Sequence, residues 1–406
     1  MKVLRNIINW PMAMARCFAR EWHTVLHDPG ALIFFVILPL MYPIAYTLIY
    51  NPEVVRELPV AVVDHDRSFE SRKLVRDASA SPTIEIYDYV PDMPAARDLM
   101  ARGDVMGILE IPSGYGRKIG RMEQANATFY CQMSLLLRYR AFVSAITNVQ
   151  LKDIADITAQ RADMLGQAGS SLSEAPIENE EHMLGDEEQG FASFVMPGVL
   201  VLILQQSMLL GICLLGGTSQ ERRRRNRGID PRDVPGAPAS AMAWGRAFCY
   251  VTFYMAAVVW LFDAVPVMFN LPHNISLVHT FLLMLPFCFA SAFLGQAMTY
   301  FVKDRESCFL VIAFTSLVYL FLSGLTWPMY AMPQMWVEAG KAIPGVWAVS
   351  AFIRMNANSA TLADCAPAMC WLWGLTAAYS VLVVLFYRYV ARRSRRLYGA
   401  TAAARS

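Results

Sequence analysis

Residues 191–228, FASFVMPGVLVLILQQSMLLGICLLGGTSQERRRRNRG, decide the fold class of this chain. The first part, Phe191–Gly217, carries no charged side chain and is long enough to cross a bilayer as one helix, which needs about 20 apolar residues. Arginines follow at positions 222–225 and 227. Clustered arginine beside a span favours the cytosolic side, so the C-terminal end of this span is predicted to face the cytosol.

Composition places the whole chain in the same class. Hydrophobic residues make up 56% of the 406 residues, which is typical of an integral membrane protein. The net charge is only +2, but basic residues gather at the termini and after position 221, while acidic residues gather in 51–190. Each basic cluster adjoins an apolar run, so the asymmetry indicates membrane topology and lipid contact, and no nucleic-acid partner is expected.

The N-terminal segment, residues 1–30, is predicted to be a cytosolic amphipathic helix. Met14, Phe18, Trp22 and Val25 recur at three- and four-residue spacing, opposite a polar face. This pattern favours a helix lying flat in the headgroup region, and a soluble core helix is the alternative. Residues 31–50 then form the first predicted span, which Pro39 and Pro43 are expected to kink and which ends on the outer side.

Residues 51–190 have charged residues throughout and short apolar runs, which predicts a small extracytoplasmic α/β domain with a largely parallel sheet. A long helix over 135–167 leads back towards the membrane, followed by an acidic linker over 168–190. The expected strands are 58–64, 83–90, 105–112 and 127–134, and the expected shorter helices are 68–79, 93–102 and 114–123.

The second span, 191–217, is followed by a cytosolic loop, 218–242, and by a region of further spans, 243–390, before a basic cytosolic tail, 391–406. The predicted fold is therefore a polytopic α-helical membrane protein with six spans and both termini in the cytosol. The four later spans are expected at 243–265, 276–301, 308–325 and 368–390.

Segment 326–350 is too polar and proline-rich to cross a membrane, and too apolar for a free loop. It is predicted to form a re-entrant pair of short helices in the outer leaflet, with an interfacial loop as the alternative. The residues expected to break or bend the chain here are Gly324, Pro328, Pro333 and Pro344.

Several local sequences occur in an order that resembles one transporter family over nearly the whole chain. They are REWHTVLHDP (20–29), LPVAVVDHDRSFESRKL (58–74), FVMPGVL (194–200) and FLSGLTWPMYAMPQ with AIPGVW (321–347). Together they resemble the permease subunits of ATP-binding cassette (ABC) transporters of the type-2 exporter superfamily. Within the second of these sequences, the opening strand and helix of the outer domain carry Asp64, Asp66 and Ser68.

The resemblance implies a cytosolic ABC ATPase as partner, a second permease subunit, and export of a hydrophobic or amphiphilic compound, with a periplasmic adaptor as a further implied partner. The family's cytosolic turn resembles E-R-E-x-G-T, whereas this chain has ERRRRNRGI at 221–229. Candidate residues for coupling to the ATPase are Glu221, Arg222, Asn226 and Gly228. The alternative is that Glu221 caps local structure while the arginines hold the span against anionic lipid.

No motif for catalysis is found in the sequence. It lacks G-x-x-x-x-G-K-[ST], so MgATP is expected on the partner ATPase and no cofactor on this chain, which is predicted not to be an enzyme. The eight cysteines show no metal-binding spacing. No charged pair lies in the middle of an apolar run, and Asp263 is the one clear carboxylate near a span interior.

Uncharged polar residues do occur within the predicted spans. They are candidates for a translocation path, with interhelical hydrogen bonds as the alternative role. The residues are Gln205, Gln206, Gln296, Ser316 and Tyr319. A second functional hypothesis is an ATPase-independent receptor or secretion accessory of the phage-infection-protein kind, which has a similar topology.

Overall fold

The computed structural model describes residues 2–50, 56–121, 123–131, 136–164, 191–226, 229–269 and 273–403. The chain forms two compact units, one of residues 1–51 with 183–406 and one of residues 52–182. The predicted acidic linker, 168–190, and Gly228 lie outside the described residues.

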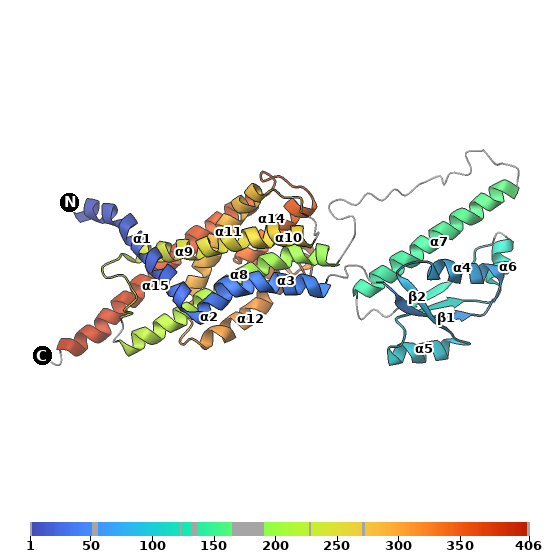
Figure 1. The fold of residues 1–406 in the computed structure, drawn as a ribbon, viewed down its shortest axis with the longest axis horizontal. Helices are drawn as coiled ribbons and strands as arrows, with labels where there is room; N and C mark the ends of the chain where they lie inside the picture. Colours follow the sequence, from blue (N-terminus) through green and yellow to red (C-terminus); the bar gives the residue numbers. More distant parts are fainter. Residues whose placement is uncertain are drawn as a thin grey trace. The chain divides into compact units, whose positions relative to one another are not determined.

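The first unit is a bundle of long helices that run side by side (Figure 1). Its first half contains α1 (Lys2–His27), α2 (Pro29–Leu32), the π-helical turn η1 (Ile33–Ile37), α3 (Leu38–Tyr50), α8 (Phe191–Arg225) and α9 (Ala239–Val259). The rest contains the π-helical turn η2 (Trp260–Ala264), α10 (Val265–Met268), α11 (Leu277–Met298), α12 (Ser307–Leu322), the 3-10 turn η3 (Met329–Ala331), α13 (Gln334–Gly340), α14 (Pro344–Ala357) and α15 (Ala366–Ala403).

Among the described residues, five helical segments are long and apolar enough to cross a membrane. These segments are Pro29–Ile49, Val195–Arg225, Ala239–Met268, Leu277–Met298 and Ala366–Arg392. The sixth predicted span, 308–325, coincides with α12, which is apolar but has only 16 residues. The mostly helical unit with several such segments confirms a polytopic helical protein in outline.

Helix α1 packs against α9 through its apolar face. The Trp22 and Phe253 rings stack with their centroids 4.2 Å apart, and Val25 is fully buried. At the crossing point the two backbones come close at Gly245, where a Cβ atom would lie 2.7 Å from the Met14 carbonyl oxygen. The amphipathic pattern of residues 1–30 therefore serves helix packing within this unit.

The sequence predicts that prolines kink the first span. The structure has a π-helical turn, η1, just before Pro39, which changes the hydrogen bonding of the helix there. Pro39 has no N–H, and in the π register of η1 that N–H would bond the Phe34 carbonyl. The Tyr254 hydroxyl of α9 donates to this carbonyl at 3.0 Å. The proline thus leaves an acceptor free, and a neighbouring helix satisfies it.

The segment between α12 and α15 forms short helices rather than a loop. Gly324 has a φ of +85°, a left-handed conformation that favours glycine, and it follows the end of α12. Helices α13 and α14 come next, and α14 continues to Ala357, beyond the predicted limit of 350. Near the start of α14, Gly345 lies against the Gln205 side chain of α8.

The second unit is a small α/β domain with a four-stranded sheet in the order β2-β1-β3-β4. β1 pairs in parallel with β2 and β3, and β4 is antiparallel to β3. The strands are β1 (Leu58–Asp64), β2 (Ile84–Tyr89), β3 (Gly107–Ile111) and β4 (Thr128–Cys131), and the helices are α4 (Phe69–Ser79), α5 (Met93–Arg102), α6 (Tyr115–Gly120) and α7 (Leu136–Met164).

Helices cover both faces of this sheet (Figure 1). Leu74 of α4 and Phe142 of α7 pack on one face, against Val60 and Leu109. Ala96 of α5 packs on the other face, against Ala61 and Ile108. Burial on both faces explains the continuous apolar runs that mark β1 and β3 in the sequence.

We expect Gly245→Ala to destabilise the packing of α1 on α9 by about 1–3 kcal/mol, because the added methyl group meets backbone rather than a movable side chain. The measurement is the thermal-unfolding midpoint of the full chain in detergent. Gly374→Ala in α15 is the matched control, since no atom lies within 4 Å of its Cβ position. An equal midpoint for the two variants would contradict the close approach.

Candidate functional site: an arginine-centred network at one end of the bundle

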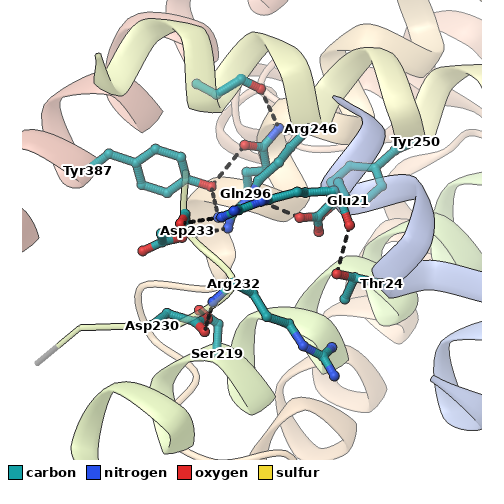
Figure 2. A network of polar contacts seen from close by, with 12 residues as sticks. Glu21, Thr24, Ser219, Asp230, Arg232, Asp233, Arg246, Tyr250, Gln296 and Tyr387 are labelled. Atoms are coloured by element: carbon teal, nitrogen blue, oxygen red, sulfur yellow. Dashed lines mark hydrogen bonds and ion pairs between the residues drawn. The ribbon is translucent and has the colours of Figure 1, made fainter. Parts of the chain in front are cut away.

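Arg246 in α9 connects several elements at one end of the bundle. Its Nε donates to Glu21 Oε2 at 3.1 Å, and its Nη2 donates to Asp233 Oδ1 at 3.0 Å. Its Nη1 donates to the Tyr387 hydroxyl oxygen at 3.2 Å. The Arg246 side chain is only 17% exposed, so these contacts replace water around the guanidinium (Figure 2).

A second layer of hydrogen bonds extends this network to further helices. The Tyr250 hydroxyl donates to Glu21, and the Tyr387 hydroxyl donates to Gln296 Oε1 at 3.0 Å. Gln296 Nε2 in turn donates to the Ala243 carbonyl at 3.2 Å. The network therefore joins α1, α9, α11, α15 and the loop that carries Asp233 (Figure 2).

The arginines at the end of α8 hold this loop in place. Arg222 forms a bidentate ion pair with Asp230: its Nε donates to Oδ1 at 2.9 Å and its Nη2 donates to Oδ2 at 3.0 Å. Arg223 Nη2 lies 2.6 Å from Asp233 Oδ2. Burial alone would raise the pKa of Asp230, but hydrogen bonds from Arg222 and Ser219 outweigh it and lower that pKa to about 2.

A third set of contacts ties the turn between α11 and α12 to the same end of the bundle. Glu221 Oε1 accepts a hydrogen bond from the Arg305 backbone N–H at 2.8 Å. The Arg305 guanidinium pairs with Asp28 at 2.8 Å, and Arg224 pairs with Asp304 at 2.8 Å. Asp28 also caps α2 through the N–H groups of residues 30 and 31.

This arrangement is suited to transmitting movement between elements. Ion pairs connect α1 and the 229–238 loop directly to Arg246 of α9, and hydrogen bonds continue from Arg246 to Tyr387 of α15 and from Tyr387 to Gln296 of α11. In the described ranges, no three His, Cys, Asp or Glu side chains are placed to hold a metal ion. The site is a network of ion pairs and hydrogen bonds that links several elements of the chain.

The family model for the ABC-2 family transporter protein matches residues 29–385. The chain belongs to the ABC-2 transporter family. The resemblance found in the sequence is thereby confirmed, and the chain is an ABC-2 type permease, a multi-pass membrane protein whose family works with a partner ATPase. No curated protein matches the chain.

The candidate coupling residues of this permease lie at the end of α8. Glu221 contacts the α11–α12 turn of its own chain, as in the capping alternative, and Arg222 holds Asp230. Asn226 is exposed in the turn after α8, where its carbonyl accepts from the Ile229 N–H at 3.1 Å. Glu221 and Arg222 are therefore engaged within the permease, and Asn226 faces outward.

The candidate path residues do not share one environment. Gln296 is hydrogen-bonded to other helices through both of its amide atoms, and the Ser316 hydroxyl donates to the Ala313 carbonyl of its own helix at 2.8 Å. Tyr319 packs partly buried against the bundle core. Gln205 is fully buried, and both amide atoms of Gln205 and of Gln206 lack a partner in the described part of the chain.

The residues predicted to shape the outer segment stand at element boundaries. Pro328 and Pro333 precede η3 and α13, and Pro344 is the first residue of α14. Gly324 follows α12 in a left-handed conformation, with its Cβ position 3.1 Å from Met329 Cγ. These residues set where the short helices begin.

In the second unit, the predicted outer-domain residues form a turn at the end of β1. Asp64 Oδ1 accepts from the N–H groups of residues 66 and 67, and Ser68 caps α4. Asp66 accepts from Gly114 N at 2.6 Å and Gly116 N at 2.8 Å. Hydrogen bonds from Ser68 and Gly116 lower the pKa of Asp66. The hydrogen bonds of Asp66 join the turn after β1 to the segment at the start of α6.

Sequence reasoning missed the centre of the network, Arg246, because its partners lie outside its own helix and one acidic partner is far along the chain. Glu21 is 225 positions away. One signal was present: Arg246 is the only charged residue between positions 239 and 262. A lone charge in an otherwise apolar helix needs a partner, and its position marks the point where other elements must meet the span.

We expect Arg246→Met to destabilise the permease by about 3–5 kcal/mol, because it leaves Glu21 and Asp233 without their shared counter-charge. Adding Glu21→Gln should recover part of this loss, since one uncompensated carboxylate is then removed. Thermal midpoints of the single and double variants in detergent measure this coupling. Strictly additive effects of the two substitutions would contradict it.

Asp230 gives a pH-dependent prediction. Its pKa is lowered in the folded state, so its stabilisation is present above its ordinary pKa and is lost as pH falls through about 2. We expect Asp230→Asn to cost about 1.5–3 kcal/mol, with a constant difference from wild type between about pH 5 and pH 8. The measurement is the unfolding midpoint across that range.

Asp304→Asn is the control for Asp230→Asn. Asp304 also pairs with an arginine of the α8 run, but the two side chains are 58% and 48% exposed. This substitution should cost less than about 1 kcal/mol. A similar loss for both variants would show that burial of Asp230 does not matter.

Proposed function

We propose that this chain is the transmembrane permease subunit of an ABC exporter that moves a hydrophobic or amphiphilic compound out across the bacterial cytoplasmic membrane. Membership of the ABC-2 family supports the transport role and implies a separate ATPase. MgATP is bound and hydrolysed by that ATPase, and the permease itself has no enzymatic activity. Binding and hydrolysis drive alternating access of the spans to the two sides.

The observation that carries the proposal is the Arg246 network. It connects α1 and the 229–238 loop to three helices of the bundle. A displacement of either cytosolic element is therefore transmitted to α9, α11 and α15. The ATPase docks against α1 and against residues 218–241, which include the end of α8, the 229–238 loop and the start of α9. Asn226 and the exposed arginines of the α8 end are available to that partner.

Sidedness follows from where the basic residues lie. The end of α8, the turn at 303–306, α1 and the last part of α15 all lie toward one end of the bundle (Figure 1). This supports a cytosolic position for that end and for both termini. We infer six spans with α12 as the fifth, and an extracytoplasmic position for the α/β unit. A periplasmic adaptor is the partner proposed for that unit.

The unpartnered glutamines support a path that opens between the spans. Gln205 and Gln206 carry buried amide groups that no described residue of this chain satisfies, and lipid offers no hydrogen bonds. A second permease subunit, identical or similar, completes the path, and the transported compound reaches these amides when the spans move apart. Re-entrant packing of α13 and α14 closes the outer end of this path.

The test is transport by the full complex in proteoliposomes. The permease is purified with its ATPase, and ATP hydrolysis and uptake of a fluorescent hydrophobic dye into inside-out vesicles are measured together. We expect Tyr387→Phe to reduce dye transported per ATP roughly five- to tenfold, because it removes hydrogen bonds to Arg246 and Gln296 worth about 1 kcal/mol each.

Tyr389→Phe is the matched control, since Tyr389 is 51% exposed and lies two residues further along α15. The amount of co-purified ATPase should be the same in both variants. Equal transport per ATP in Tyr387→Phe and wild type would remove the network from coupling. Absence of any bound ATPase, with function retained, would favour the ATPase-independent receptor.

A further inference from the structure

A small pocket with a cavity volume of about 50 Å³ lies where α1, α8, α9, α11 and α15 meet the 229–238 loop. Its lining combines basic and apolar side chains. The basic wall consists of Arg222, Arg223, Arg232 and Arg246, and the carboxylate of Glu21 also lines the pocket. The apolar lining residues include Ile212, Leu215, Phe386 and Val390. Such a combination suits a ligand that is anionic at one end and apolar at the other.

The positive charges of the basic wall exceed the carboxylates that neutralise them. Arg246 is paired with Glu21 and Asp233, Arg223 with Asp233, and Arg222 with Asp230. The Arg232 guanidinium has no ion-pair partner in the described ranges of the chain, and only its backbone N–H bonds Asp230, at 3.0 Å. Figure 2 shows the Arg232 side chain extended away from Asp230.

A second, independent observation concerns Arg223. Its Nη2 is held by Asp233, but its Nε is buried and has no acceptor among the described residues. A buried donor without an acceptor costs free energy, and an oxygen anion in the pocket would satisfy it. Arg223 and Arg232 line the same pocket, so one oxyanion group has two guanidinium groups to contact.

We propose that this pocket binds a phosphate group, with Arg232 and Arg223 as its ligands. Guanidinium groups bind phosphate through paired, charge-assisted hydrogen bonds. The phosphate comes either from a phospholipid headgroup, whose chains then lie against Phe386 and Val390, or from a free anion. Because Arg232 of the loop and Arg246 of α9 both line the pocket, a bound phosphate group stabilises the position of the loop on the bundle.

The test uses the full chain in a neutral maltoside detergent, with the thermal-unfolding midpoint titrated against two probes. The probes are dihexanoylphosphatidylglycerol and inorganic phosphate. We expect a rise in the midpoint for wild type, and an apparent affinity roughly tenfold weaker in Arg232→Gln, because one charge-assisted contact is lost. A response to the phospholipid alone assigns a headgroup site, and an equal response to inorganic phosphate assigns a free-anion site.

Arg225→Gln is the matched control, since it removes the same charge from an exposed arginine of α8 outside the pocket. It should titrate like wild type. Arg232→Lys should retain more affinity than Arg232→Gln, which separates loss of binding from loss of fold. The proposal is overturned by a wild-type titration in Arg232→Gln, or by no response of wild type to either probe. Neither measurement involves ATP, so the proposed transport function stands or falls separately.

Discussion

A guanidinium group inside an apolar helix bundle must meet anionic groups of the protein, and this constraint organises one end of the permease. Arg246 belongs to a segment that is otherwise uncharged, and its side chain is largely removed from water. Its carboxylate partners come from α1 and from the loop after α8. Satisfying one charge therefore fixes two peripheral elements against the spans, which is what a coupling device requires.

Backbone polar groups of the helices also find hydrogen-bond partners on neighbouring helices. Pro39 removes a donor from the first span, the helix adopts a π-helical turn, and Tyr254 supplies the missing hydrogen bond from α9. Glycine permits the close approaches that such contacts need. At Gly217 of α8 a Cβ would lie 2.7 Å from the Asp304 carbonyl oxygen of the α11–α12 turn. Helix ends, turns and α1 are thereby held within hydrogen-bonding distance.

The glutamines of the bundle show why position matters more than residue type. Gln296 is bonded on both amide atoms and links three helices, so its role is in holding the bundle together. Gln205 is also buried, but neither of its amide atoms has a partner among the described residues, so its hydrogen-bonding capacity is unused in this conformation. Both occur as polar residues in apolar helices, and only their surroundings distinguish them.

The sequence by itself determined the class of fold, because apolar length and arginine clustering act locally along the chain: the α8 span, the strand-helix alternation of the second unit and the family can all be predicted from it. Tertiary structure alone decided the site. Glu21 and Tyr387 are 225 and 141 positions from Arg246 in the sequence, so no local pattern couples them to it. Hydrophobicity places a helix in a membrane, whereas the pairing of buried charges depends on which helices pack together.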